Sequence, residues 1–73
     1  MNPQEVVKEE ILKMLQQDYG QLKQIIEDII ATRNPDRKKL GEAYFHLQKI
    51  NMELYRLIGL VTYEEWIRSL PKS

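Results

Sequence analysis

The chain has 73 residues, and its eleven basic and eleven acidic side chains give a formal net charge of zero at pH 7. This length allows one domain at most, and the neutral balance provides no global field that would attract nucleic acid or an acidic membrane. The absence of cysteine excludes disulfides, thiolate metal sites and a cysteine nucleophile. A single domain over residues 1–73 is therefore expected.

A first helix is predicted from about residue 3 to residue 33. Asn2 is a favoured N-cap residue, and Pro3 suits the first helical position. Alternating spacings of three and four predict a core-facing stripe made of Leu12, Leu15, Tyr19, Leu22, Ile26 and Ile29. Asp18 could cap a new helix after a break near Gly20, but the unbroken apolar phase favours one continuous helix.

A second helix is predicted over residues 35–58. Asn34 and Pro35 repeat the capping signal, and Gly59 is typical of the residue that follows a helix end. The same apolar spacing predicts an inner face made of Leu40, Ala43, Tyr44, Leu47, Ile50, Leu54, Leu57 and Ile58.

A short third helix is predicted over residues 63–70, because Thr62 and Glu65 have the spacing of a capping box. The short turn at Asn34 makes the two long helices antiparallel neighbours. The predicted fold class is therefore all-α, an antiparallel helical hairpin of two long helices with a short C-terminal helix.

The second helix carries apolar residues on more than one side. Phe45 and Met52 point away from the predicted inner face, Tyr55 lies at its edge, and Trp66 follows in the short helix. A core this small seldom supplies more than a few kcal/mol, and no disulfide is available to reinforce it. We therefore expect these four residues to form an interface and the chain to form a homodimeric four-helix bundle, the alternative being simple exposure of a few apolar side chains.

Two polar residues, Asp18 and Asn51, fall inside the apolar arcs of the two helices. Asp18 stands sixteen residues before Asn34 and Asn51 stands seventeen after it, so an antiparallel hairpin places them at the same level. Such a polar core layer can fix register or oligomeric state at some cost in stability. A buried ligand or proton site is one alternative, and a capping role for Asp18 is another.

No set of residues with a catalytic or metal-binding pattern stands out. His46, the only histidine, follows Glu42 by four residues, whereas a di-iron bundle needs a Glu-x-x-His spacing and several inward carboxylates. A solvated or boundary histidine is expected instead. Ser69 and Ser73 are accompanied by no base or oxyanion loop, and no glycine-rich phosphate loop is present. We expect no enzymatic activity, no metal and no cofactor.

Basic residues cluster only around the predicted turn, at Arg33, Arg37, Lys38 and Lys39. A solvated helix boundary explains them most simply, and contact with nucleic-acid phosphates is the alternative. The leading functional hypothesis is a non-enzymatic, homo-oligomeric regulator or adaptor that binds another protein. A small nucleic-acid-binding regulator that uses the basic turn is the second hypothesis.

The location of the protein follows from two absences in the sequence. The N-terminus lacks the basic-then-apolar pattern of a secretory signal, and the longest apolar runs have two or three residues. A membrane-spanning helix needs about 20. We therefore expect a cytoplasmic protein with no membrane contact.

Overall fold

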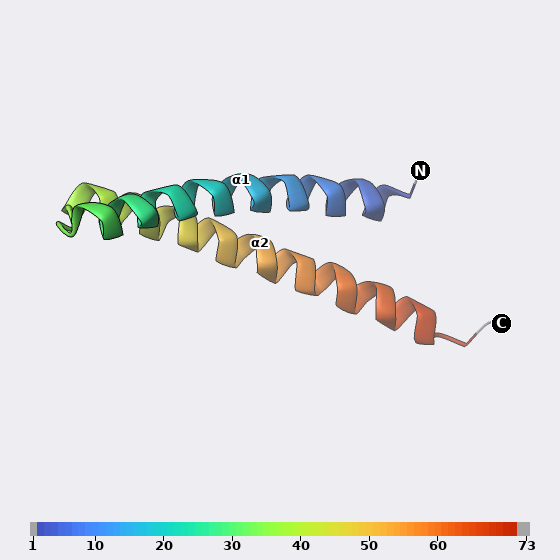
Figure 1. Cartoon of the computed structure of the whole chain (residues 1–73). Helices are drawn as coiled ribbons and strands as arrows, with labels where there is room; N and C mark the ends of the chain where they lie inside the picture. Colours follow the sequence, from blue (N-terminus) through green and yellow to red (C-terminus); the bar gives the residue numbers. More distant parts are fainter. Residues whose placement is uncertain (1, 72–73) are drawn as a thin grey trace.

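The computed structural model describes residues 2–71, which form two long helices joined by a short turn. Helix α1 spans Pro3–Thr32 and helix α2 spans Arg37–Ser69. The helices run antiparallel in a rod of 62 × 20 × 15 Å, with the two chain ends at one end and the turn at the other (Figure 1). The predicted all-α helical hairpin is confirmed.

The start and the continuity of α1 agree with the sequence. The Asn2 side chain caps the helix by accepting a hydrogen bond of 3.0 Å from the backbone N–H of Gln4, and Pro3 occupies the first turn. The helix then continues through Gly20 without interruption. The alternative of a break near Gly20 is therefore excluded.

Helix α2 begins two residues later than predicted, at Arg37 and not at residue 35. Helix α1 ends where Arg33 adopts a left-handed conformation, with φ of 54° and ψ of 19°. The N-cap of α2 is Asp36, whose carboxylate accepts a hydrogen bond from the Lys38 N–H, and not Asn34. Pro35 disfavours helical geometry at Asn34, and Asp36 is as good a cap as Asn34. The connection between the helices is therefore longer than predicted, and α2 begins after Asp36.

The predicted end of the second helix at residue 58 and the separate helix over residues 63–70 are wrong. Helix α2 passes through Gly59 to Ser69, and Gly59 has a negative φ. One glycine inside a helix costs only about 1 kcal/mol. The residues beyond it still face α1, because Glu64 lies 3.6 Å from the ammonium group of Lys8.

The two helices meet along a seam with the spacing of a coiled coil, in which the steps alternate between four and three residues. On α1 the seam residues, all buried or partly buried, are Gln4, Lys8, Ile11, Leu15, Asp18, Leu22, Ile25 and Ile29. On α2 they are Lys39, Ala43, His46, Ile50, Glu53, Leu57, Leu60 and Glu64.

The predicted core-facing stripes are rotated by about one residue from this seam. Leu12, Tyr19 and Ile26 are exposed, and Ile11, Asp18 and Ile25 take their places. The same rotation on α2 exposes Leu40, Tyr44, Leu47, Leu54 and Ile58. The most apolar side of each helix is therefore not the side that meets the other helix.

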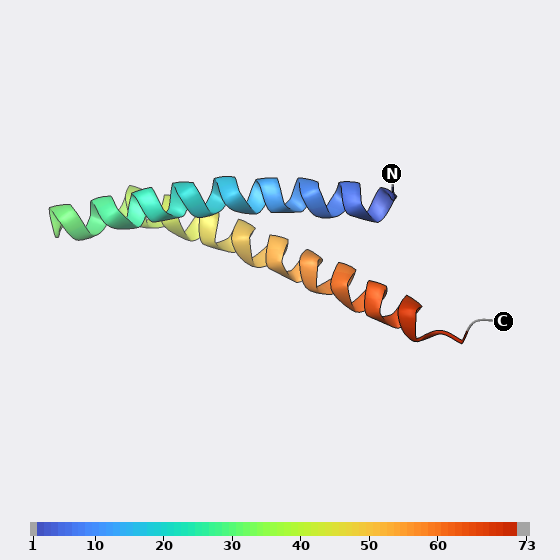
Figure 2. The same cartoon turned by 45° about the vertical axis from the view of Figure 1, so that its right-hand side comes forward.

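The seam is polar at both ends. The ribbons separate toward the chain termini (Figures 1 and 2), where Lys8 reaches Glu5 at 3.1 Å and Glu64 at 3.6 Å. At the turn, Lys39 pairs with the carboxylate of Asp28. Ile11 is the one large apolar side chain of residues 2–71 that is fully buried, with 2% exposed.

The left-handed residue at the turn leads to a prediction about stability. This conformation costs an L-residue about 1–2 kcal/mol, and it is the conformation that glycine supplies at helix ends. Arg33→Gly should therefore raise the free energy of unfolding by roughly 0.5–1 kcal/mol, measured by urea unfolding. Ala31→Gly, two residues earlier in regular helix, should instead lower it by about 1 kcal/mol. A loss of stability in both variants would contradict this assignment.

Candidate interaction surfaces and a buried polar cluster

A cluster of charged side chains occupies the middle of the seam. The carboxyl groups belong to Asp18 of α1, 4% exposed, and Glu53 of α2, 3% exposed. The Asp18 Oδ1 atom lies 2.9 Å from His46 Nδ1 and 3.2 Å from Lys49 Nζ. His46 and Lys49 therefore bind the same carboxylate oxygen of Asp18.

Glu53 has a different environment in the same cluster. Its carboxyl group is within hydrogen-bonding reach of Asp18, while its Oε1 atom is buried and has no hydrogen-bond partner among the described residues. Burial, together with the hydrogen bond to Asp18 and the Asp18 charge, raises the pKa of Glu53 to about 7. Lys49 and Arg56 act weakly in the opposite direction.

Asp18 is the ionised member of the pair. Burial alone would raise its pKa, but hydrogen bonds with Glu53, His46 and Lys49 together lower the pKa of Asp18 below its ordinary value. The two carboxyl groups thus have pKa values shifted in opposite directions by one shared environment.

The composition of this cluster corrects the predicted polar layer. Asp18 lies inside the seam, but Asn51 is exposed and faces away from it. His46, expected to be solvated or at a boundary, is partly buried, and its Nδ1 atom lies 2.9 Å from Asp18 Oδ1. The sequence contained a signal for this cluster that apolarity alone overlooks. His46 and Glu53 are seven residues apart, so they occupy the same position in successive heptads and lie on the same side of α2.

A continuous apolar surface, here called the apolar flank, lies beside the seam. Its members are the apolar residues among the exposed positions next to the seam on one side of each helix, namely Leu12, Tyr19, Ile26, Leu40, Leu47, Leu54 and Val61. They are 41–58% exposed and recur every seven residues along each helix. Within α1 and α2 the same row holds charge only near the chain ends, at Glu5 and Arg68.

The opposite side of the seam shows that the two halves of the flank face the same way. There Met14 of α1 lines one depression together with Lys49 and Arg56 of α2, and Asp28 lies beside Lys39 and Glu42 in another. Met14 and Asp28 border the seam on the side away from Leu12 and Ile26, as Glu42, Lys49 and Arg56 do on α2. Since the residues on this side of the two helices meet each other, the residues of the apolar flank on the other side of the seam also face the same way.

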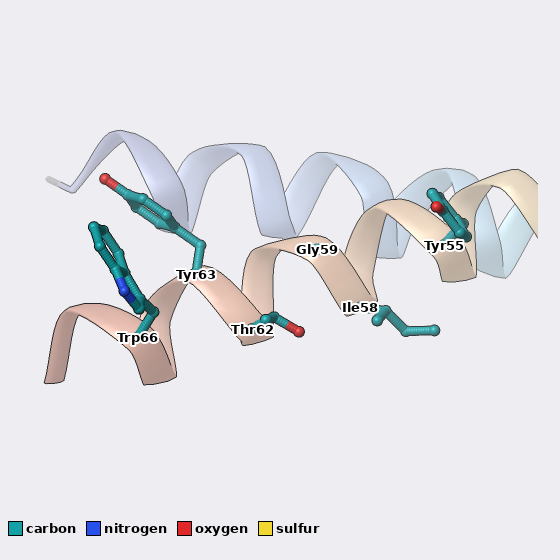
Figure 3. A pocket seen from close by; sticks show the side chains of 6 residues that line it. All are labelled: Tyr55, Ile58, Gly59, Thr62, Tyr63 and Trp66. Atoms are coloured by element: carbon teal, nitrogen blue, oxygen red, sulfur yellow. The ribbon is translucent and has the colours of Figure 1, made fainter. Parts of the chain in front are cut away.

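A second apolar surface, here called the aromatic stripe, lies on the outer face of α2 and comprises Phe45, Met52, Tyr55 and Trp66, all exposed. Lys49 Nζ lies 5.5 Å from the centre of the Phe45 ring, a cation–π distance. Near its C-terminal end the stripe borders an open depression of about 500 Å³, with Tyr55 at one end, Tyr63 and Trp66 side by side at the other, and Gly59 between them (Figure 3).

The exposed surface is large for the size of the chain. The structure exposes 6314 Å², whereas a compact monomer of 8.7 kDa would expose about 4,700 Å². The difference is about 1,600 Å², and a standard protein interface removes only about 800 Å² from each partner. The hairpin therefore has enough surface for an interface of ordinary size on each of two sides.

One of the four basic residues at the turn forms an ion pair within the hairpin, and the other three are exposed. Lys39 is held by Asp28, and this hydrogen bond raises the pKa of the Lys39 ammonium. Arg33, Arg37 and Lys38 are exposed and form no ion pair with any residue of the range 2–71. Three of the four predicted contact residues are thus accessible at the tip.

Two further features of the described residues bear on function. No three histidine, aspartate or glutamate side chains between residues 2 and 71 converge in a way that could hold a metal ion. Neither α1 nor α2, as far as the structure describes them, contains a stretch long and apolar enough to span a membrane.

The fold and the heptad seam define an antiparallel, coiled-coil-like helical hairpin with two unpaired apolar surfaces. Residues 3–59 match the family described as Sulfolobus spindle-shape virus 1, protein D-63. The match covers most of the chain, and the protein belongs to this family. No solved structure matches the chain.

The buried cluster leads to a prediction about stability. Replacing a buried ionic network by apolar residues of similar size is often stabilising by about 1–4 kcal/mol. The double variant Asp18→Leu/Glu53→Leu should therefore unfold at higher urea concentration, because His46 and Lys49 can both reach solvent. The single variant Asp18→Leu should be less stable than the double variant, since it leaves Glu53 buried without its partner. A double variant less stable than the natural chain would show that the cluster is a net source of stability.

Proposed function

We propose that the protein is a homodimer closed through the apolar flank and that it acts by binding another protein, as a regulator or adaptor. The observation that carries this proposal is the direction of the apolar surface. The richest apolar side of each helix points to one side of the hairpin, where a single chain provides no cover. A second hairpin placed there by a two-fold axis gives a four-helix bundle with a continuous core.

The composition of the two apolar surfaces supports a division of roles between them. The apolar flank is mainly aliphatic, regular in spacing and shared by both helices, as the core of a helical bundle requires. The aromatic stripe belongs to α2 alone and combines Phe45, Tyr55 and Trp66 with nearby Lys49, a composition typical of recognition surfaces. We propose that the flank joins two subunits and that the stripe binds the partner protein.

A nucleic-acid-binding function remains the second proposal, and one observation favours it. Arg33 occupies a left-handed position that glycine would adopt without strain, and it stands beside the unpaired Arg37 and Lys38. In a dimer this basic tip would be present twice. The zero net charge of the chain argues against a large electrostatic contribution from the rest of the surface.

The subunit interface can be tested by one charge substitution on each surface. Leu47→Glu places a carboxylate in the middle of the apolar flank, where burial in a dimer would be strongly unfavourable. We expect light scattering to show the mass of one chain for this variant and twice that mass for the natural protein.

Two variants serve as controls for this experiment. Gln48→Glu adds the same charge one residue further along on the outer face and should leave the dimer intact. Phe45→Glu should also leave the dimer intact while it abolishes binding of the partner protein. Monomers from Phe45→Glu, with dimers retained in Leu47→Glu, would show that the aromatic stripe is the subunit interface.

The second proposal is tested by reversing charge at the turn. If the tip binds phosphates, Arg37→Glu/Lys38→Glu should abolish binding to RNA or DNA in fluorescence anisotropy, and binding by the natural protein should weaken steeply with salt. Lys13→Glu/Lys23→Glu makes the same charge change far from the turn and should preserve binding. Absence of binding by the natural protein even at low salt would exclude this function.

A further inference from the structure

We infer that the paired carboxyl groups of Asp18 and Glu53 hold one proton between them and act as a pH-sensitive lock on the hairpin, closed in mildly acidic solution and weakened in alkaline solution. The pair lies midway along the seam, one carboxyl from each helix, and each residue is at least nine-tenths buried. The inference concerns the folding of one hairpin, and it holds whether or not the proposed dimer forms.

The geometry explains why the two carboxyl groups hold one proton and why this proton lies on Glu53. Two carboxyl groups can form a hydrogen bond with each other only when one of them is protonated. His46 Nδ1 and Lys49 Nζ both lie at Asp18 Oδ1, at 2.9 and 3.2 Å, so the groups that can stabilise an anion gather at Asp18. The Glu53 Oε1 atom is buried with no partner in the described chain, which is tolerable for a neutral carboxyl group and unfavourable for an anion.

The charged groups around the pair come from both helices. From α1 the cluster contains Asp18, and from α2 it contains His46, Lys49 and, at longer range, Arg56. Lys49 and Arg56 favour the anion of Glu53, but burial and the adjacent Asp18 charge outweigh them, and the pKa of Glu53 rises to about 7.

The direction of the pH effect follows from these shifts. Glu53 is protonated in the folded hairpin at pH values where its unfolded form is already ionised, so its contribution to stability is full below its ordinary pKa of about 4.5 and is lost as pH rises through about 7. The lowered pKa of Asp18 has the opposite effect, because its contribution is present above its ordinary pKa of 3.8 and is lost as pH falls below that value. Stability due to the pair is therefore greatest in mildly acidic solution.

The most direct test is an NMR titration of the side-chain carboxyl carbons in the intact natural protein. The Glu53 carbon should titrate with a midpoint near 7, and Glu64, a seam residue paired with Lys8, serves as the internal comparison. A Glu53 midpoint near the ordinary value of 4.5 would overturn the inference, and this measurement does not depend on any variant being able to fold.

A second test follows the consequence of the proton for stability. Thermal unfolding by circular dichroism, at one protein concentration, should show the natural protein losing at least about 5 °C in Tm between pH 5.5 and pH 8.5. Glu53→Gln keeps the shape of the neutral carboxyl group and a donor toward Asp18, but it cannot ionise. It should match the natural Tm at pH 5.5 and lose less than half as much at pH 8.5.

Two controls separate Glu53 from other titrating groups. His46→Gln removes the one imidazole of the cluster, and most of the natural loss in Tm should persist in this variant. Glu64→Gln neutralises a different seam carboxylate and should leave the loss unchanged. If the loss vanishes in His46→Gln and persists in Glu53→Gln, the switch is the histidine and the inference about a shared carboxyl proton is wrong.

Discussion

Two helices packed as a pair hide only a narrow strip of each other, and in this hairpin the apolar arc of each helix is wider than that strip and is displaced to one side of it. The seam residues include Lys8, Asp18 and Glu53, whereas the row that holds the apolar flank carries charge within the two helices only near the chain ends, at Glu5 and Arg68. Burial of apolar surface is the main driving force of folding. This displacement of the apolar surface is the reason for proposing that a second subunit covers the flank.

The polar residues of the seam can determine the register in which the two helices pack. Apolar seams of regular spacing can slide by one heptad with little change in contact, whereas a buried polar group distinguishes one register from its neighbours. Sliding α2 by seven residues toward the turn would place Glu53 where His46 now lies beside Asp18. Arg56 would take the place of Lys49, but Asp18 would lose its histidine, so the observed register is the one in which Asp18 keeps its bond to His46.

The sequence predicts the architecture from local signals, and its errors occur where long-range packing decides. Asn2 caps α1 as expected because capping depends only on neighbouring residues. Gly59 resembles a helix end, yet contacts such as Lys8 with Glu64 continue the helix beyond it. The seam was misplaced by about one residue because the prediction followed apolarity alone, and that criterion finds the widest apolar arc rather than the strip that meets the other helix of the same chain.

The segment that matches the D-63 family also contains the buried cluster and most of the apolar flank. Residues 3–59 contain the whole buried cluster and every member of the apolar flank except Val61, whereas Trp66 of the aromatic stripe and its neighbour Tyr63 lie beyond the match. Continuity of α2 past Gly59 extends the outer face of one helix from Phe45 to Trp66. The aromatic stripe therefore continues beyond the matched segment, and in the proposed division of roles it would stay free for recognition while the apolar flank joins the subunits.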